Sequence, residues 1–540
     1  MFRPYRQDQS YLLPPSLGDF LDETHPAHAI NDIIEKIDLS TLMSRYGKMG
    51  QPAYHPRMMV KVILYGFTVG VFSSRRLQRA CQENLAFKYL AGMETPAFKT
   101  FIEFRKRHRD DMKAVFVETV KLARELGLAR LGAVALDGCK MAADTSKHKA
   151  MSYGRMREEE GRLREEMAGL LKQADEADAR EDDEDGPDDD GYGLKKELAR
   201  RESRLKKIEA AKAALEEREK KSNPGKPIDP KKQISFADHD ARCHAKKGSG
   251  ARYVHNSQAA VDMESQIIVE NHIEDTVQDA NAAKETLENM KGDLGETPDD
   301  LVADAAYGNQ HTVDSCRDHG VTPVCAVSRE GKEGKAGAAI DEFSYDGERN
   351  DFTCPHGAVF EFSHECPNGE QVMYGSREPL SCGCAHYMVK DGRGRLKVHK
   401  GHFAKRELKL IMEGKKELYR RRKCTVEPVF GQIQVGMGFR RYFYRGRSNV
   451  RSEWNLVCAA FNVKKITALL RAGKACLGRD SMRANDRYLL RPDAVGNGRT
   501  VGWRKSLFDS FWRKFAKPER LYLELVAAIN GEGAPLMQYA

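Results

Sequence analysis

The chain of 540 residues carries 89 Lys and Arg against 80 Asp and Glu, a net charge of +9, and 40% of its residues are hydrophobic. Its length predicts roughly two to four domains, and its longest apolar stretch, Val62 to Phe72, is shorter than the ~20 residues of a membrane span. Because the first residues lack a signal-peptide pattern and the 12 cysteines lack the framework of a small secreted domain, we expect a cytoplasmic protein without disulfides and with no membrane partner.

Residues 1–130 are expected to form an all-helical N-terminal domain, because their apolar residues recur at helical spacing. The third of its short helices would run from Pro96 to Arg109 and turn three basic side chains outward: Arg105, Lys106 and Arg107. Short helices with a basic last member resemble a helix-turn-helix, so we predict that this helix binds DNA. A solvated amphipathic face is the alternative.

A short apolar run, Ala133 to Leu136, precedes Asp137 and Gly138. This pattern predicts a buried strand with a carboxylate at its end. In the charge-rich segment 155–222, apolar residues then follow heptad spacing in two arms, with an acidic stretch at 181–190 between them. The simplest interpretation is an antiparallel helical hairpin with a disordered tip.

Strands and helices alternate in the next part of the chain. Two strands, Tyr253 to Val261 and Ile267 to Ile273, are expected to form a hairpin, and a further short strand ends in Asp304. A strand at Pro323 to Val327 and the intervening helices complete the pattern. It predicts an α/β core, a mixed sheet with flanking helices.

Residues 330–400 are rich in Gly, Cys and charge and are interpreted as an insertion. A long helix from about Phe403 to Gly431 resumes the core and carries Glu427. The core domain so outlined spans 131–470, with insertions at 155–222 and 330–400. Residues 471–540 form a C-terminal extension to which the sequence assigns no role.

Three acids far apart in the chain meet the needs of phosphodiester chemistry: Asp137 and Asp304 at strand ends, and Glu427 on a flanking helix. Cleavage and strand transfer require an activated attacking oxygen and a stabilised leaving oxygen, which two Mg²⁺ ions about 3.5–4 Å apart provide. Mg²⁺ prefers oxygen ligands such as carboxylates. The 80 acids of the chain offer many other triples, so local motifs must support this choice.

Three motifs surround these acids: Leu136-Asp137-Gly138 followed by Asp144-Thr-Ser-Lys; Ala303-Asp304-Ala-Ala-Tyr307-Gly308; and Val426-Glu427-Pro-Val-Phe-Gly431 followed by Gly438-Phe-Arg-Arg441. In this order they resemble the catalytic blocks of the DDE transposases of bacterial insertion sequences, over roughly residues 10–470. The resemblance implies a ribonuclease H-like catalytic core, a helical N-terminal DNA-binding domain and a helical insertion after the first aspartate.

The resemblance also implies what the protein does. The three acids would hold two Mg²⁺ ions, with Mn²⁺ as a substitute, and the enzyme would cleave double-stranded DNA at transposon ends and join it to target DNA. A homodimer is expected in the complex with DNA. An inactive or domesticated DNA-binding protein and a nuclease without strand transfer remain the alternatives.

The chain departs from the family pattern at three places. Tyr419-x-x-Arg422 lies one residue further from the glutamate than in the family signature, and Gln434 occupies the position of a lysine. His255-Asn-Ser-Gln258 stands where the family has Tyr-Asn-x-Gln. The carboxylates are intact, but the contacts with terminal DNA are thereby in question. Asn256 and Gln258 could equally be ordinary strand residues.

Basic residues gather around and after the glutamate: Lys423, Arg440, Arg441, Arg445 and Arg447. Interleaved aromatic residues, Tyr442 to Tyr444, favour phosphate and base-stacking contacts with DNA. The alternative is a solvated basic surface.

The second insertion offers ligands for a tetrahedral zinc ion, and the candidates are Cys354, Cys366, Cys382 and Cys384, with His356 and His386 nearby. The closely spaced Cys-x-x-Cys pairs of a zinc ribbon are absent from the sequence. Free thiols in a loop are the alternative.

Overall fold

The structure is a computed structural model and describes residues 16–47, 52–181, 192–246, 250–327, 340–367 and 369–473. The chain divides into two compact units, Met1–Tyr488 and Leu489–Ala540, and every described residue belongs to the first. The acidic tip predicted between the hairpin arms and nearly all of the C-terminal extension lie outside the described residues. None of the helices in the described ranges is long and apolar enough to cross a membrane.

The N-terminal region is helical. After a short 3-10 turn, its helices are α1 (Pro26–Lys36), α2 (Ser40–Met43), α3 (Pro56–Thr68), α4 (Ser74–Glu83), α5 (Leu85–Ala91), α6 (Phe98–Arg107) and α7 (Met112–Glu125). Pro56 begins α3 at a position where the missing N–H has no helical partner, and the Ser73 hydroxyl accepts the N–H of Arg76 at the start of α4. Helix α3 is buried over most of its length and packs against α1, α5 and α13 (Arg447–Arg471).

A mixed sheet follows. Its strands are β1 (Ala133–Ala142), β4 (Arg242–Lys246), β5 (Gly250–Asp262), β6 (Ile268–Glu274), β7 (Asp300–Ala303) and β8 (Thr322–Cys325). The strand order is β4-β5-β1-β7-β8, and β6 also pairs with β5. Strand β1 is antiparallel to β5 and parallel to β7, which is parallel to β8. Helices α10 (Ala282–Leu294) and α11 (Gln310–Asp318) lie between the strands in the sequence, so the mixed sheet with flanking helices is confirmed.

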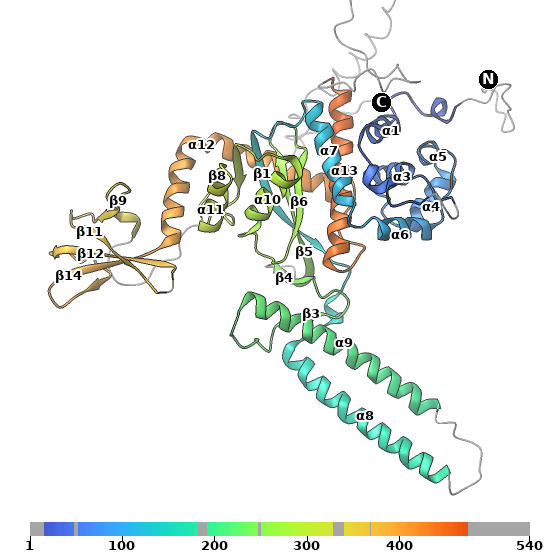
Figure 1. The fold of residues 1–540 in the computed structure, drawn as a ribbon, viewed down its shortest axis with the longest axis horizontal. Helices are drawn as coiled ribbons and strands as arrows, with labels where there is room; N and C mark the ends of the chain where they lie inside the picture. The colour runs from blue at the N-terminus through green and yellow to red at the C-terminus, as the bar shows by residue number, and fades with distance from the viewer. Residues whose placement is uncertain are drawn as a thin grey trace, which may run out of the picture. The chain divides into compact units, whose positions relative to one another are not determined.

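Two long antiparallel helices, α8 (Tyr153–Glu181) and α9 (Tyr192–Ser222), occupy the first predicted insertion (Figure 1). They share a small apolar core, and at their base β2 (Ala150–Ser152) pairs with β3 (Gln233–Ser235). Two residues that interrupt the heptad pattern pair across the helices. Arg201 lies 2.8 Å from Glu166, and Lys212 lies 2.8 Å from Glu160.

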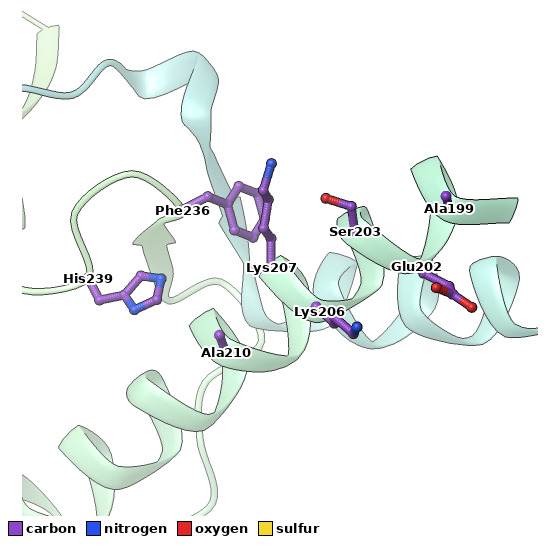
Figure 2. Close-up of a pocket in the computed structure, with 8 residues that line it drawn as sticks. All are labelled: Ala199, Glu202, Ser203, Lys206, Lys207, Ala210, Phe236 and His239. Atoms are coloured by element: carbon purple, nitrogen blue, oxygen red, sulfur yellow. The ribbon is translucent and has the colours of Figure 1, made fainter. Parts of the chain in front are cut away.

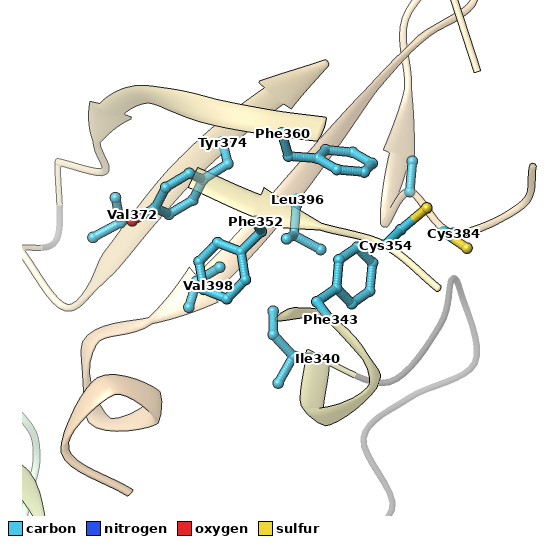
Figure 3. Packing of buried hydrophobic residues seen from close by; sticks show 11 residues of the cluster. Ile340, Phe343, Phe352, Cys354, Phe360, Val372, Tyr374, Cys384, Leu396 and Val398 are labelled. Carbon is cyan, nitrogen blue, oxygen red and sulfur yellow. The ribbon is translucent and has the colours of Figure 1, made fainter. Parts of the chain in front are cut away.

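The second insertion forms an antiparallel sheet with a core of its own (Figure 3). Its strands, in the spatial order β13-β14-β12-β11-β10-β9, are β9 (Ser344–Asp346), β10 (Asp351–Thr353), β11 (Val359–Glu365), β12 (Gln371–Pro379), β13 (Tyr387–Met388) and β14 (Arg393–His399). Figure 3 shows the rings of Phe352, Phe360 and Tyr374 in this core. Phe403 of α12 (Lys400–Gly431) packs against it, with its ring centroid 5.2 Å from that of Tyr345.

Helix α12 continues into a π-helical turn, Gln432–Gly436, and α13 then returns through the interior. Helix α13 packs against α7, α3 and β6. The indole N–H of Trp454 donates to the Gln258 carbonyl oxygen at 2.9 Å. Helix α13 therefore joins the N-terminal helices to the sheet.

A buried acid on α13 gives the fold a pH dependence. Glu453 is 2% exposed, and its carboxylate accepts the backbone N–H groups of Phe443 and Tyr444 at 3.1 and 3.2 Å. Burial raises the pKa of Glu453 to about 7, although these N–H groups and Arg105 act to lower it.

We expect Glu453→Gln to remove part of the pH dependence of stability. The folded-state pKa lies above the ordinary value of 4.5, so the stability contributed by this carboxyl is complete below that value and is lost as the pH rises through about 7. The difference between the folded-state pKa and the ordinary value corresponds to about 3 kcal/mol in the free energy of unfolding. Denaturant unfolding at several pH values should show the variant gaining about that much relative to the parent between about pH 4.5 and about pH 8. A constant difference between the two proteins would contradict this role.

Candidate active site

The first two predicted acids follow the last paired residues of two neighbouring parallel strands. In the pair β1 and β7, Leu136 is the partner of Ala303, and the next residues are Asp137 and Asp304. Asp304 follows the end of β7 as expected, whereas Asp137 lies within β1, because β1 continues to Ala142 along β5. The apolar strands are buried, whereas the two aspartates are only partly covered. Pairing of two apolar strands therefore delivers two carboxylates to one edge of the sheet.

The Asp137 carboxylate is in an environment that suits a cation. Its side chain is 21% exposed, Oδ1 accepts the N–H of Gly138 at 2.8 Å, and Oδ2 lies 3.4 Å from Nη1 of Arg422. The pKa of Asp137 is raised to about 6, chiefly by burial; the Gly138 N–H and Arg422 act to lower it, and Asp304 and Asp279 contribute to the rise. Because the two carboxylates repel each other, a divalent cation between them would stabilise both in the ionised form.

The third predicted acid, Glu427, is exposed on α12, which packs against β1, β5, β7 and β8. Lys415 of α12 pairs with Asp300 at the start of β7, and further along the helix Arg422 reaches Asp137. In the π-helical turn beyond, the Gln434 amide nitrogen lies 2.8 Å from Sγ of Cys139 on β1.

Helix α12 therefore runs past the strands from their starts toward their carboxyl ends, and Glu427 lies beyond the point where the helix meets Asp137. In the described ranges, ligand atoms within 4.8 Å of one another occur in two groups, and neither includes these three acids. Glu427 is thus on the helix that packs over the two aspartates, but no three carboxylate oxygens, one from each acid, all lie within 4.8 Å of one another.

A polar network supports the strand ends that carry the two aspartates. The Lys140 ammonium donates to both carboxylate oxygens of Asp279 at 2.6 Å, and Asp279 Oδ1 also accepts the side-chain amides of Asn256 and Gln258 at 2.9 and 2.7 Å. Gln258 Oε1 accepts the Tyr307 hydroxyl at 2.6 Å. Gln258 thus connects β5 both to Asp279 and to Tyr307, in the segment that follows Asp304. The sequence did not identify Lys140 or Asp279 as parts of the site, because their partners are distant in the chain. It indicated Arg422 only as a member of the signature around the glutamate and did not connect it with Asp137.

On α6, the prediction for Arg105 is wrong. Arg105 is 6% exposed, and its guanidinium donates to the Phe72 carbonyl oxygen and the Tyr444 hydroxyl, each at 3.1 Å. Helical spacing from Phe101 places Arg105 on the buried face, where a long side chain carries its charge to internal acceptors. Lys106 and Arg107 are exposed, as expected.

Four of the five basic residues around Glu427 are exposed: Lys423, Arg440, Arg441 and Arg445. Two of them also pair with Asp144, Arg441 at 3.4 Å and Arg445 at 2.9 Å. The guanidinium of Arg447 is used within the fold, because it pairs with Asp275 and donates to the Ile273 carbonyl oxygen at 3.0 Å.

The aromatic residues between these arginines differ in accessibility. Tyr442 is completely buried and its hydroxyl lies 2.6 Å from that of Ser257, so the expectation that it stacks on DNA bases is wrong. Phe443 is 41% exposed. Of the residues Tyr442 to Tyr444, Phe443 therefore has the most accessible ring.

A basic hollow that the sequence did not indicate lies at the base of the helical hairpin. Its lining includes His148, Lys149, Arg155, Arg204, Lys207 and Arg445. A neighbouring pocket, shown in Figure 2, is also lined by Lys207 and adds Lys206 and His239. Basic side chains of the hairpin and of the segment after Glu427 thus meet at one surface, which suits contacts with phosphates.

Three of the four predicted zinc ligands come together. Sγ of Cys354 lies 3.8 Å from Sγ of Cys382, and Nδ1 of His356 lies 3.1 Å from Sγ of Cys384. Cys366 is not part of this group, and His356 completes it instead. The reason is the length of β11: Cys354 precedes the strand and Cys366 follows its last residue, so the strand separates them.

We expect Gly138→Ala to disturb the network around Asp279. A Cβ atom at Gly138 would lie 2.4 Å from Nε2 of Gln258 and 2.5 Å from Oδ1 of Asp279. Such overpacking costs about 1–3 kcal/mol, measurable as a lower free energy of unfolding in urea. The matched control is Gly161→Ala on α8, where a Cβ meets nothing within 4 Å and stability should stay equal or rise. Equal stabilities of the two variants would contradict the tight packing.

Two family models match the chain. The transposase domain model (DUF772) covers residues 15–107, and the transposase DDE domain model covers residues 224–463. Asp304 and Glu427 fall within the second segment, whereas Asp137 lies between the two. No curated protein matches.

Among solved structures, the chain is similar to the cryo-EM structure of the piggyBac transposase synaptic complex with hairpin DNA. The identity is 10%, the alignment covers 96% of this chain and 87% of that chain, and the TM-score is 0.26. The two family models agree with the resemblance found in the sequence motifs: the chain belongs to the DDE transposases of insertion sequences.

Proposed function

We propose that this transposase cleaves DNA at the ends of its insertion sequence and joins those ends to target DNA, with Asp137, Asp304 and Glu427 as the ligands of two Mg²⁺ ions. Mn²⁺ is expected to substitute. The observation that carries the proposal is the register of β1 and β7, which brings Asp137 and Asp304 together beneath the helix of Glu427. The raised pKa of Asp137, with burial as its first cause and two neighbouring acids adding to it, supports a cation site.

The core that carries these acids is proposed to be ribonuclease H-like. Two arrangements support this. Strands β6, β5 and β1 are successively antiparallel, and β7 and β8 then extend the sheet parallel to β1. The acids follow β7 and lie within β1, the two central parallel strands.

The three acids share the role of metal ligands in the proposed reaction but are held in different ways. Metal ions bound to them would activate the attacking oxygen and stabilise the leaving oxygen. Asp137 and Asp304 are held by paired strands, so their spacing is fixed before DNA arrives. Glu427, on the surface of α12, would complete the site, and Arg422 keeps the Asp137 carboxylate in place.

The reaction has two steps. Water attacks the phosphodiester at the transposon end and leaves a free 3′-hydroxyl, which then attacks a phosphodiester of the target. The bond to the bridging oxygen breaks in each step, so no covalent protein intermediate is needed and no Ser or Tyr nucleophile is assigned.

Replacing each acid by its amide should nearly abolish metal-dependent cleavage and leave end binding intact, because amides are poorer ligands than carboxylates. The variants are Asp137→Asn, Asp304→Asn and Glu427→Gln. Glu417→Gln on the same helix is the matched control, since the Glu417 side chain is 80% exposed and pairs with neighbouring Arg420 at 3.3 Å. Cleavage and strand transfer of labelled end DNA are measured together.

The outcomes separate the alternatives. Near-parental cleavage by any acid variant removes that residue from the site. Cleavage without strand transfer by the parent protein identifies a nuclease, and end binding without either reaction identifies a regulatory DNA-binding protein.

We further propose that two exposed regions hold DNA in different ways. Lys106 and Arg107, at the exposed end of α6, would contact the transposon end, whereas Arg440 and Arg441 would contact phosphates near the acids. Arg105 is withdrawn from the first set because it is buried. A homodimer in the DNA complex is part of this proposal.

Neutralising the first pair (Lys106→Gln with Arg107→Gln) should reduce the preference for end DNA over random DNA. Neutralising the second pair (Arg440→Gln with Arg441→Gln) should weaken binding to both and lower the salt slope by up to about one per lost phosphate contact. The control is Arg349→Gln in the second insertion, a side chain 79% exposed. Titrations against end and random duplexes at several salt concentrations decide the assignment, and unchanged discrimination in the first variant would exclude α6 from end recognition.

A further inference from the structure

Four nitrogen and sulfur ligands converge at one end of the second insertion. Cys354 and His356 lie in the turn between β10 and β11, and Cys382 and Cys384 lie in the loop between β12 and β13. One ligand atom from each of the four lies within 4.8 Å of the others. Two separate loops therefore supply a pair of ligands each.

The spacing matches a tetrahedral metal site. With metal–sulfur bonds of ~2.3 Å, as in zinc proteins, two sulfurs of a tetrahedron are ~3.8 Å apart. The Cys354 and Cys382 sulfurs are 3.8 Å apart. A disulfide would require about 2.05 Å, so the pair has the separation of two metal ligands rather than of a covalent bond.

The turn of the first ligand pair is shaped around the Cys354 sulfur. Gly357 has a φ of +85°, a conformation that favours glycine, and the chain then turns back so that the N–H of Ala358 points to Sγ of Cys354 at 3.3 Å. An N–H directed at sulfur stabilises a thiolate, which is the form that binds metal.

A crosslink would stabilise the insertion, because its apolar core is small. The core rests on aromatic residues such as Phe352, Phe360 and Tyr374, and two of the converging cysteines close one side of it (Figure 3). Cys354 and Cys384 are each 3% exposed. A core of this size supplies little stability, and natural small domains often add a disulfide or a metal.

We propose that Cys354, His356, Cys382 and Cys384 bind one structural zinc ion that holds the second insertion together. Three thiolates and one imidazole are a ligand set typical of closed zinc sites. The site lies in a different sheet from the three acids, so the proposal does not depend on the proposed reaction.

Loss of zinc should loosen the insertion and leave the catalytic sheet folded. Helix α12 departs from helical geometry at Lys415, which is paired with Asp300 of β7. The insertion packs on the part of the helix before this bend, and Arg422 and Glu427 lie after it. The bend therefore separates two parts of α12: the part that packs on the insertion and so depends on the metal, and the part whose Arg422 pairs with Asp137.

The test uses the full chain purified under reducing conditions. Elemental analysis should find about one zinc per chain, and Co²⁺ in its place should give the absorption bands of tetrahedral thiolate coordination. Cys382→Ser should lose the metal or bind it more than tenfold more weakly, whereas Cys366→Ser, in the same insertion but outside the cluster, should keep it. His356→Cys should retain zinc and His356→Ala should not.

A second measurement covers the case in which Cys382→Ser does not fold. Removal of zinc from the parent protein by a chelator should speed proteolysis within residues 340–399 and leave α13 protected, and zinc should reverse the effect. No bound zinc after reconstitution, equal metal loss from Cys366→Ser, a disulfide between Cys354 and Cys382 in reducing buffer, or an iron–sulfur chromophore in the isolated protein would each overturn the proposal.

Discussion

Two carboxylates held next to each other in a partly buried position are the constraint around which the core is built. Parallel pairing of β1 with β7 keeps Asp137 and Asp304 close together, because each directly follows the last pair of the register, Leu136 with Ala303. The surroundings compensate for part of the repulsion through the Gly138 N–H and the Arg422 guanidinium. The pKa of Asp137 nevertheless stays raised, with burial as its largest cause. A site with residual negative charge at a fixed spacing is suited to divalent cations.

Helix α13 connects this sheet to the N-terminal helices, because it packs against β6 and also against α3 and α7. The Asn462 side chain makes both backbone hydrogen bonds of Ile268 on β6, at 2.9 and 2.8 Å, and also donates to the hydroxyl of Thr119 on α7 at 3.2 Å. One buried amide thus joins three elements. Arg105 adds a second connection, from α6 to Tyr444 in the segment between α12 and α13. Side chains that look like surface residues in the sequence therefore join the helical region to the core.

The elements that could be predicted from the sequence are those with a strong local signal. An apolar run that ends in an acid identified β1 and the segment before Asp304, and helical spacing identified α3. The strands of the second insertion were not predicted. Strands β9 and β13 are short and have exposed residues, so they show no clear alternation, although β12 and β14 do alternate in burial. Arg105 and Tyr442 were assigned to the surface because residue type alone does not reveal a buried hydrogen-bond partner. Cys366 was chosen over His356 as a zinc ligand because spacing in the chain does not show that the turn before β11, and not the turn after it, lies beside Cys382 and Cys384.

The position of the second insertion in the chain follows from the same geometry. It enters after β8, at the edge of the sheet order, and leaves directly into α12, so none of the strand pairs that hold the aspartates is interrupted. Its sheet packs on the start of α12 through Phe403, whereas the ion pair of Lys415 with Asp300 holds the helix where β7 begins. Helix α12 departs from helical geometry at Lys415, so the bend separates the part of the helix that packs on the second insertion from the part that carries Arg422 and Glu427.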